Sequence, residues 1–587
     1  MNILGLSCYY HDSAAALLQD GHLIAAAEEE RFNRKKHYFG FPELAIQYCL
    51  KEAGITANDL DIIAFYEKPL KKFARLMTNF VATWPKSYSA FRQALPIWLH
   101  EKLWIRRAIL KNLDIKKPVL FGEHHLSHAA SGFLVSPFEE AAILTLDGVG
   151  EWSTTAIGYG KGTDITLENE IRFPHSLGLL YSTITAYLGF RVNDAEWKVM
   201  GLAPYGKPTH VAKFEELITT KPDGSFRLNL DYFAYHYHAS LPFNERFEQH
   251  FGRPRRPPGD DHPEEFFRDI AHSGQKVTEN AIVNMAQAAY DRYGLDKLCI
   301  AGGVGLNSVA NWRIMQKTPF KDIFIQPAAG DDGAAVGVAF HIYNTVMGKP
   351  RSYVMDNAYL GPSFTNEEIE DFLKSRGIQY DAYNKEGMLE RTAKEIAANK
   401  VIGWFQGRME FGPRALGSRS ILANPMNPEM KDIINAKIKF REKFRPFAPS
   451  VLKDRANEYF DLGDLDSPYM LLIPDVKMDK RSVIPAVTHE DGTGRVQTVT
   501  KEANGIYYDL ISMVDKINGC PVVLNTSFNV RGEPIVCTPE DGYNCFMKTG
   551  IDILVMGNYV IETKDESTLS EEVREADYEQ MDKEPSG

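Results

Sequence analysis

Short apolar runs alternate with amphipathic segments along nearly the whole chain. In the first half these runs predict strands at 3–8, 14–18, 22–29, 61–66, 142–146 and 322–327, and a strand that begins at 297 and enters a double-glycine turn. Helical periodicity is present at 43–54, 124–132, 177–188, 264–293, 307–315 and 333–340. Strands that alternate with helices in this way predict an α/β fold.

The second half repeats the alternation after a break near 345–362. Helices are predicted at 365–376, 386–399, 505–517 and 539–548, and strands near 380 and at 401–405, 449–452, 521–529 and 552–556. We therefore expect one domain at 1–350 and a second at 351–562. The acidic tail at 563–587 is poor in aromatic residues and is predicted to be disordered.

Three segments of the first half are less regular. The aromatic and basic stretch 67–118 predicts one or two amphipathic helices. The stretch EWKVMGLAPYG, at 196–206, predicts a loop that faces a ligand. The segment 222–263 is rich in loop residues and predicts a surface excursion, and its prolines at 254, 257 and 258 argue against a regular element around them.

Composition and charge argue against several classes of protein. A chain of 587 residues predicts two to four domains, and a formal charge of −12 argues against a nucleic-acid scaffold, which would be basic. No apolar run reaches the roughly 18 residues of a spanning helix, and the N-terminus reads as a strand and not as a signal peptide. Six scattered cysteines without a CxxC pair predict reduced core residues. We expect a cytoplasmic protein with no nucleic-acid or membrane partner.

Two histidines in EHHLSHAASG have the spacing of metal ligands on one helix face. His124 and His128 lie four residues apart, which brings both imidazoles to one side, whereas His125 falls off that side. A strand then delivers Asp147 beside a glycine turn, where a carboxylate can serve as a third ligand or can hold a metal-bound water. An isolated HxxxH is more often a pair of satisfied core histidines. Asp147 and a second acidic turn at Asp331 favour a metal site here.

Two glycine turns at strand ends predict contacts to an anion or a nucleotide. The first runs through Gly302 and Gly303 to a helix that begins at Asn307, and the N–H groups of such a helix point at a ligand. The second turn, GDDG, carries Asp331 and Asp332 before a helix of small residues. Either turn alone is weak evidence for a site.

A small polar turn between the first two strands carries His11 and Asp12, whose side chains can orient a hydroxyl or a water. Turns at this place hold a phosphate in ATPases of the actin, hexokinase and Hsp70 type, although most hairpin turns bind nothing. The basic run that follows includes Lys36 and is most simply a solvated charged face.

The segment 401–447 is basic in an otherwise acidic chain. It threads glycines and phenylalanines between cations that include Arg414, Lys439 and Arg445. Arginine presents a planar fork that matches phosphate or carboxylate. The interleaved aromatic residues favour the wall of a packed pocket over a solvated basic face.

Residues further along the chain could complete an anion pocket with Lys439 and Arg445. Arg495 lies in DGTGRVQTV, and Asn525 and Ser527 lie in LNTSFN, each after a strand or turn. Simple turn chemistry is an equally good explanation of Asn525 and Ser527.

These stretches carry a family resemblance. GRMEFGPRALGSRS, followed by KFREKFRPFAPS, resembles the C-terminal signature of the O-carbamoyltransferases, which include the nodulation-factor, cephamycin and tobramycin carbamoyltransferases. The ordered hairpin turn, HxxxH, strand-Asp-Gly and glycine-helix turns resemble the actin-like ATPase fold of the tRNA threonylcarbamoyltransferase proteins. The C-terminal part resembles a YrdC-like α/β fold. The resemblance covers about residues 1–562.

The resemblance implies a reaction in two steps. The C-terminal domain binds carbamoyl phosphate and, with ATP, forms carbamoyl-AMP and pyrophosphate. The N-terminal domain then transfers the carbamoyl group to a hydroxyl of a small acceptor such as a natural product or a sugar. A divalent metal is also implied. The resemblance favours Fe²⁺, and Zn²⁺ and Mn²⁺ are the alternatives. Mg²⁺ accompanies ATP.

Residue by residue, the resemblance extends to the following positions. The implied metal ligands are His124, His128, Asp147 and Asp331, although whether Asp331 or Asp332 is the ligand stays open. The implied cofactor-binding residues are Gly302, Gly303, Asn307, Asp332, Arg414, Lys439, Arg445, Arg495, Asn525 and Ser527. Near the acceptor lie Lys36 and, as the expected base, Asp12, with His11 in reserve.

Other functions remain open. An actin-like small-molecule kinase or ATPase would explain the N-terminal turns but not HxxxH or the basic segment. A non-catalytic relative would be expected to lose the metal and anion residues, and a tRNA-modifying role conflicts with the negative charge. The acceptor and the oligomeric state, with a homodimer among the alternatives, stay open.

Overall fold

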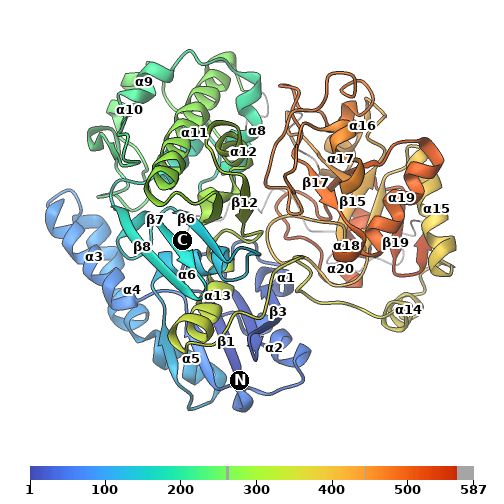
Figure 1. Ribbon diagram of the computed structural model, residues 1–587, viewed down its shortest axis with the longest axis horizontal. Coiled ribbons are helices and arrows are strands. Elements are labelled where there is room, and N and C mark those ends of the chain that lie inside the picture. The colour runs from blue at the N-terminus through green and yellow to red at the C-terminus, as the bar shows by residue number, and fades with distance from the viewer. Residues whose placement is uncertain (260–262, 440, 443, 563, 565–587) are drawn as a thin grey trace. The chain divides into compact units, whose positions relative to one another are not determined.

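The computed structural model describes residues 1–259, 263–439, 441–442, 444–562 and 564 (Figure 1). The chain divides into two compact units. The first consists of Met1–Glu29 and His37–Met355, and the second of Glu30–Lys36 and the residues from Asp356 onward. Apart from Lys564, the tail predicted to be disordered at 563–587 lies outside the described residues.

A five-stranded sheet begins the first unit. Its order is β3-β2-β1-β4-β5, from β1 (Asn2–Ser7), β2 (Ala14–Gln19), β3 (His22–Glu28), β4 (Ile62–Phe65) and β5 (Val119–Phe121). Strands β1, β2 and β3 are antiparallel, and β4 and β5 run parallel to β1 on its other side. The apolar runs of β1, β2 and β4 are almost wholly buried, as is typical of strands covered on both faces.

The second sheet of this unit repeats the pattern of the first. Its order is β12-β11-β6-β7-β8, from β6 (Glu140–Leu146), β7 (Ser153–Lys161), β8 (Asp164–Arg172), β11 (Lys297–Ala301) and β12 (Asp322–Ile325). Strands β6, β7 and β8 form an antiparallel meander, and β11 and β12 run parallel to β6 on its other side. Two copies of one topology confirm the predicted actin-like α/β fold. A small hairpin, β9 (Ile218–Thr220) and β10 (Phe226–Leu228), is separate.

Helices connect and cover the two sheets. They are α2 (Glu43–Glu52), α3 (Pro69–Ala82), α4 (Tyr88–His100), α5 (Ile105–Leu113), α6 (His124–Phe133), α7 (Leu177–Tyr187), α8 (Glu196–Leu202), α9 (Val211–Glu215), α10 (Glu245–Phe251), α11 (Glu265–Tyr293), α12 (Ser308–Lys317) and α13 (Asp331–Phe340). Helix α13 packs on β1, β2 and β4, α6 packs on β6 and β11, and α6 and α13 pack on each other (Figure 1). The pair therefore lies between the sheets. Among the described residues, we find no helix with the length and apolar character needed to cross a bilayer.

Close packing of α6 on α13 requires a glycine at 337. A Cβ at this position would lie 1.8 Å from the backbone oxygen of Ser127 in α6. We expect Gly337→Ala to lower the free energy of unfolding by about 2–4 kcal/mol, because rigid backbone must move to admit the methyl group. Urea unfolding measures this change. In Gly132→Ala, the matched control on α6, the nearest contact is 3.4 Å, and stability should stay within about 1 kcal/mol of wild type. Equal losses in both variants would contradict this account.

Two expectations for this unit need correction. The stretch EWKVMGLAPYG is not a loop, because Glu196–Leu202 forms α8, which packs on α7 and α11. Tertiary packing there outweighs the low helix propensity of Gly201. The loop-rich segment 222–263 also holds α10, which is capped at its N-terminus by Asn244, whereas residues 252–259, with Pro254, Pro257 and Pro258, form no helix or strand, as predicted. The segment 67–118 forms three helices, α3, α4 and α5, and not one or two.

The second unit contains one mixed sheet of eight strands. Its order is β13-β20-β19-β14-β15-β18-β16-β17, from β13 (Asp381–Ala382), β14 (Ile402–Phe405), β15 (Arg419–Ala423), β16 (Ala448–Leu452), β17 (Gln497–Val499), β18 (Val522–Ser527), β19 (Ile553–Met556) and β20 (Tyr559–Ile561). Its helices are α1 (Glu30–Asn33), α14 (Asn366–Ser375), α15 (Lys385–Ala397), α16 (Met430–Ile434), α17 (Ala456–Tyr459), α18 (Lys501–Asn504), α19 (Ile506–Asn518) and α20 (Pro539–Lys548). The α/β class predicted for this half is confirmed.

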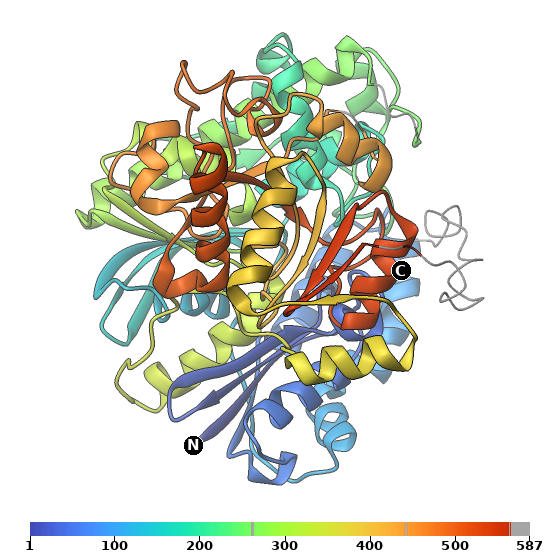
Figure 2. The same ribbon diagram turned by 90° about the vertical axis from the view of Figure 1, so that its right-hand side faces the viewer.

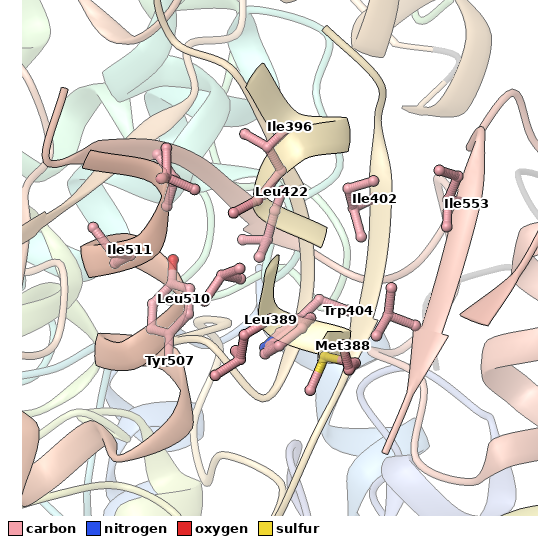
Figure 3. Packing of buried hydrophobic residues seen from close by; sticks show 14 of the residues in the cluster. Met388, Leu389, Ile396, Ile402, Trp404, Leu422, Tyr507, Leu510, Ile511 and Ile553 are labelled. Atoms are coloured by element: carbon pink, nitrogen blue, oxygen red, sulfur yellow. The ribbon is translucent and has the colours of Figure 1, made fainter. Parts of the chain in front are cut away.

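The core of the second unit lies between the sheet and the helix pair α15 and α19. Figure 2 shows α15, the gold helix near the centre, running along the sheet. Ile396 of α15, Leu510 of α19 and Ile402 of β14 belong to one buried cluster (Figure 3). Trp404 is fully buried in the same cluster and donates its indole N–H to the backbone oxygen of Gly417 at 2.9 Å. This bond ties the basic segment to the sheet.

The short segment Glu30–Lys36 belongs to the second unit, although both of its neighbours in the chain belong to the first. Arg31 donates to the backbone oxygen of Gly412 at 2.9 Å, and Arg34 donates to that of Ile535 at 2.7 Å. Phe32 packs against Met409, Ile535 and Cys537. The chain thus crosses from the first unit to the second and back within a few residues.

Candidate functional site

Four potential metal ligands, His124, His128, Asp147 and Asp331, converge in the first unit and are called the metal group below. His124 and His128 lie one turn apart on α6, Asp147 follows β6, and Asp331 is the first residue of α13. The strand end and the two central helices therefore deliver all four side chains to one buried place. Each can present a ligand atom within 4.8 Å of the others.

The distances within this group fit a single divalent metal. His124 Nε2 lies 3.1 Å from Asp147 Oδ2, 3.1 Å from His128 Nε2 and 3.5 Å from Asp331 Oδ1. His128 Nε2 lies 3.4 Å from Asp331 Oδ1. Ligands at about 2.1 Å from one metal and at tetrahedral angles would be separated by roughly 3.4 Å. Nitrogen and carboxylate ligands suit Fe²⁺, Zn²⁺ or Mn²⁺ and do not choose among them. Asp331, and not Asp332, is the aspartate that faces the histidines.

Further polar groups hold these ligands in place. Glu67 Oε2 lies 3.8 Å from His124 Nδ1, so the ring nitrogen that faces away from the group has a carboxylate nearby. The backbone N–H of His124 donates to Glu151 at 3.1 Å, and Tyr66 donates its hydroxyl to Asp331 at 3.4 Å. His125 Nδ1 lies 2.7 Å from the hydroxyl of Thr145, outside the group, as the helical spacing predicts.

The electrostatics of the bare group favour a cation. Burial opposes charge on His124, but Asp331 and Asp147 outweigh burial and raise its pKa well above the usual range. Burial likewise opposes ionisation of Asp147, but His124 holds its pKa well below the usual range. The site therefore keeps its carboxylates ionised, which a metal requires of its ligands.

The N-terminal turn lies beside this group. His11 Nε2 is 3.9 Å from Asp331 Oδ2, and His11 Nδ1 is 2.9 Å from Asp12 Oδ2. Burial opposes the charge on His11, but Asp331 and then Asp12 raise its pKa to about 9. A cation bound to Asp331 would remove the larger of these two carboxylate effects. Lys36, the third predicted catalytic residue, is exposed and belongs to the second unit.

The predicted nucleotide residues lie close to the metal group or serve the fold. Gly302 has φ +93°, and a Cβ there would lie 2.2 Å from the backbone oxygen of Leu146. Gly303 donates its N–H to Asp147 Oδ1 at 3.2 Å. Asn307 accepts the N–H of Ala310 at 3.1 Å and so caps α12.

Asp332 is buried at the start of α13. Burial, and then repulsion from Glu28 and Asp12, raises its pKa well above the usual range, which favours the protonated acid. A neutral carboxylic acid is a poor metal ligand, and this agrees with the choice of Asp331.

The cations of the second unit include a buried lysine. Lys439 ends the π-helical segment Asn435–Lys439 and donates to the backbone oxygen of Ser527, and to Asn529 Oδ1 at 2.8 Å. Burial, and then repulsion from Arg441, lowers its pKa well below the usual range. Lys439 therefore fixes the end of β18.

Four arginines share this region and repel one another. Burial, and then Arg445, lowers the pKa of Arg441, and burial followed by Arg414 lowers the pKa of Arg495. Burial lowers the pKa of Arg414 to about 10, and its buried Nε has no hydrogen-bond partner among the described residues. Arg445 lies 3.2 Å from the carboxylate of Glu442. Clustered, desolvated guanidinium groups are costly unless an anion joins them.

Asn525 and Ser527 lie on β18, and Ser527 contacts Lys439. The amide group of Asn525 is buried and donates to Ser450 Oγ and Gln497 Oε1, each at 3.1 Å. Ser527 donates its hydroxyl to Asn529 Oδ1 at 2.8 Å. Asn525 therefore orders the strand, whereas Ser527 borders the ammonium group of Lys439.

A cavity of about 490 Å³ also lies in the second unit. Its lining includes Gln406 and Gly557, which directly follow β14 and β19, and Phe364. None of the predicted cofactor-binding residues lines it. Its lining carries Lys385 but no arginine, so the anion site is better placed at the clustered arginines.

Several residues of the site were missed in the sequence. Glu67 follows β4 as Asp147 follows β6, so the strand-end pattern could have indicated it. Asn529 lies two residues after Ser527, in the same turn. His37 and Asp194, which extend the hydrogen bonds of Asp12, carry no signal in the sequence, because only tertiary structure joins them.

Two family descriptions match the chain. "Carbamoyltransferase N-terminus" matches residues 2–340, and "Carbamoyltransferase C-terminus" matches residues 393–563. The first match contains the four metal-ligand candidates, and the second contains the cluster of cations.

Individual relatives match over most of the chain. An uncharacterized protein of Synechocystis is 49% identical and covers 95% of this chain and 96% of its own. Nodulation protein NolNO of Sinorhizobium fredii is 38% identical and covers 95% of this chain and 79% of its own. Nodulation protein NolO of Bradyrhizobium diazoefficiens is 38% identical over 75% of this chain and 78% of its own. Among solved structures, HypF of T. kodakarensis is 13% identical with a TM-score of 0.30 over 59% of this chain and 48% of its own.

Proposed function

The chain belongs to the carbamoyltransferase family, and from this premise we propose that it carbamoylates a hydroxyl group of a small-molecule acceptor, a natural product or a sugar, with carbamoyl phosphate and ATP. The transfer of a carbamoyl group is the activity of the family. The donor, the nucleotide and the class of acceptor are the proposal.

The mutual repulsion of the buried cations in the second unit is the observation that carries this proposal. Lys439, Arg441 and Arg495 all have pKa values lowered by burial and by other cations of the cluster. A phosphate or triphosphate would relieve this repulsion through charge-assisted hydrogen bonds. Arg414 has a buried guanidinium nitrogen left to donate to such an anion.

The first step would take place at this cluster. One water cleaves carbamoyl phosphate to phosphate and carbamate, and a carbamate oxygen then attacks the α-phosphorus of ATP. Pyrophosphate leaves and carbamoyl-AMP remains. Arg414, Arg445 and Arg495 would hold the anions, and Lys439 with Ser527 would border the reacting group. Mg²⁺ would accompany ATP, as it does for most nucleotide substrates.

The second step would take place at the metal group of the first unit. A divalent metal held by His124, His128, Asp147 and Asp331 would act as a Lewis acid toward the carbamoyl carbonyl. We favour Fe²⁺, with Zn²⁺ and Mn²⁺ as the alternatives. The acceptor hydroxyl would attack the carbonyl carbon, its proton would pass to a base, and AMP would leave.

His11 suits the role of that base better than Asp12. Both oxygens of Asp12 face imidazole nitrogens, Nδ1 of His11 at 2.9 Å and Nδ1 of His37 at 2.7 Å. Nε2 of His11, in contrast, faces the metal group. Asp12 therefore orients His11, and His11 accepts the proton.

The remaining proposals concern the cellular compartment, the binding partners and the alternative function. Six free, buried cysteines fit a reaction in the cytoplasm. We expect neither a nucleic-acid nor a membrane-spanning partner. The alternative function is an actin-like small-molecule kinase or ATPase, which the duplicated sheet topology alone would also accommodate.

One assay tests the proposal. The protein is incubated with ATP, carbamoyl phosphate, Mg²⁺ and one of the three metals, with water as the only acceptor. We expect AMP, pyrophosphate and phosphate in equal amounts, and only when both substrates are present. ADP released without any need for carbamoyl phosphate would replace the proposal with the kinase-like alternative.

A further inference from the structure

A chain of hydrogen bonds leads away from the metal group through the N-terminal turn. His11 Nδ1 lies 2.9 Å from Asp12 Oδ2, Asp12 Oδ1 lies 2.7 Å from His37 Nδ1, and His37 Nε2 lies 2.9 Å from Asp194 Oδ1. The four side chains are 24–29% exposed. Imidazole and carboxylate therefore alternate over four residues from three separate segments of the first unit.

The chain of bonds constrains the proton positions. An ionised carboxylate only accepts hydrogen bonds, so each imidazole nitrogen that faces one must carry a proton. His37 lies between two carboxylates, so both of its ring nitrogens are placed to donate. Burial would raise the pKa of Asp12, but hydrogen bonds from His11 and His37 hold it well below the usual range. His11 consequently presents an N–H to Asp12 and keeps Nε2 toward the metal group.

The backbone holds this arrangement in an unfavourable conformation. Asp12 has φ +50° and His37 has φ +56°, in the left-handed region that residues other than glycine seldom adopt. Two backbone hydrogen bonds join their segments, from the N–H of Ser13 to Tyr38 at 2.8 Å and from that of Tyr9 to Phe39 at 2.7 Å. Strain of this kind persists only where the surroundings enforce it, and it gathers at functional sites.

We propose that His37 and Asp194 are positioning residues for carbamoyl transfer, which act by holding Asp12 and, through Asp12, by fixing the tautomer and the direction of the His11 ring. This role rests on the proposed function of the metal group. It gives a role to two residues that are not among the proposed metal ligands and lie far from those ligands in the sequence. The nearest analogy in principle is a buried carboxylate that orients a catalytic imidazole, whose loss is costly because the wrong tautomer results.

Imidazole NMR signals test the proposal directly. In protein labelled with ¹⁵N-histidine, long-range ¹H–¹⁵N spectra at pH 7 distinguish the two neutral tautomers and the doubly protonated ring. The His11 and His37 signals are identified by their loss in His11→Gln and His37→Ala. In wild type loaded with Zn²⁺, one of the three candidate metals, which offsets the charge of Asp331, we expect His11 to carry its proton on Nδ1 and His37 to be doubly protonated. In His37→Ala, and in the gentler Asp194→Asn, the His11 pattern should change to that of exchanging tautomers.

A kinetic readout accompanies the spectra. With water as the acceptor, AMP release should fall about ten- to a hundredfold in His37→Ala, while the initial burst of pyrophosphate stays unchanged. Added imidazole should restore part of the rate in His37→Ala but not in Asp12→Ala. His22→Ala, an exposed histidine of the same unit, is the control and should match wild type.

An unchanged His11 tautomer in folded His37→Ala and Asp194→Asn would overturn the positioning role. A burst of pyrophosphate lost together with AMP release would also count against it, because that result means general damage. If wild type forms no pyrophosphate at all, the proposed function fails, while the NMR result still decides whether His37 orders His11.

Discussion

Replacing His128 by alanine is expected to reduce carbamoyl transfer about a thousandfold while leaving pyrophosphate formation intact. His128 Nε2 lies 3.1 Å from that of His124 and 3.4 Å from Asp331, so its removal takes away one side of the metal group. The three remaining ligands should hold the metal far more weakly. Metal content, measured by mass spectrometry after dialysis, should fall with AMP release.

The control for His128 lies on the same helix. His125 is buried too, but it binds Thr145 and stands outside the metal group. His125→Gln should therefore keep the metal and most of the activity. Loss of pyrophosphate formation in His128→Ala would contradict the assignment of the two steps to separate sites. Full metal content in that variant would contradict the ligand assignment.

Arg414→Gln is expected to have opposite effects on activity and stability. Pyrophosphate release should fall about a hundredfold or more, because a preorganised donor to the developing anionic charge is lost. Thermal stability should stay the same or rise, since one of several desolvated, mutually repelling cations is removed. Scanning calorimetry and the pyrophosphate assay measure the two effects on the same sample.

The matched control for Arg414 is an exposed cation of the same segment. Lys437→Ala removes a positive charge close to Lys439 in sequence and should change neither activity nor stability appreciably. Carbamoyl phosphate should raise the melting temperature of wild type and not that of Arg414→Gln, because a ligand stabilises only the protein that binds it. A large drop in stability of Arg414→Gln would show that Arg414 serves the fold and not an anion.

The metal group was predictable because its signals are local. His124 and His128 follow the period of one helix, and Asp147 and Asp331 follow apolar strands that end at glycine turns. Parallel strands and the helices that follow them bring such ends together, so short-range patterns located a long-range site. The same reasoning could have found Glu67, which also follows a strand.

The rest of the site depends on contacts that leave no periodic trace. His37 and Asp194 meet Asp12 only after three segments fold together, and both look like ordinary polar loop residues. The assignment of Glu30–Lys36 to the second unit rests on Phe32 packing against Met409 and on arginines that bind distant carbonyl groups. The helix α8 was missed because Gly201 suggested a break, whereas packing on α7 and α11 decides its conformation.

The most direct test of the two-step account is to trap the carbamoyl group between the sites. His128→Ala, supplied with ATP and [¹³C]carbamoyl phosphate, should form pyrophosphate but transfer the carbamoyl group slowly. Rapid quenching followed by mass spectrometry should then reveal ¹³C-labelled carbamoyl-AMP on the protein, in an amount that approaches one per chain. The double variant His128→Ala/Arg414→Gln should not form this intermediate. If the label stays in carbamoyl phosphate while ATP is converted to ADP, the central claim is wrong.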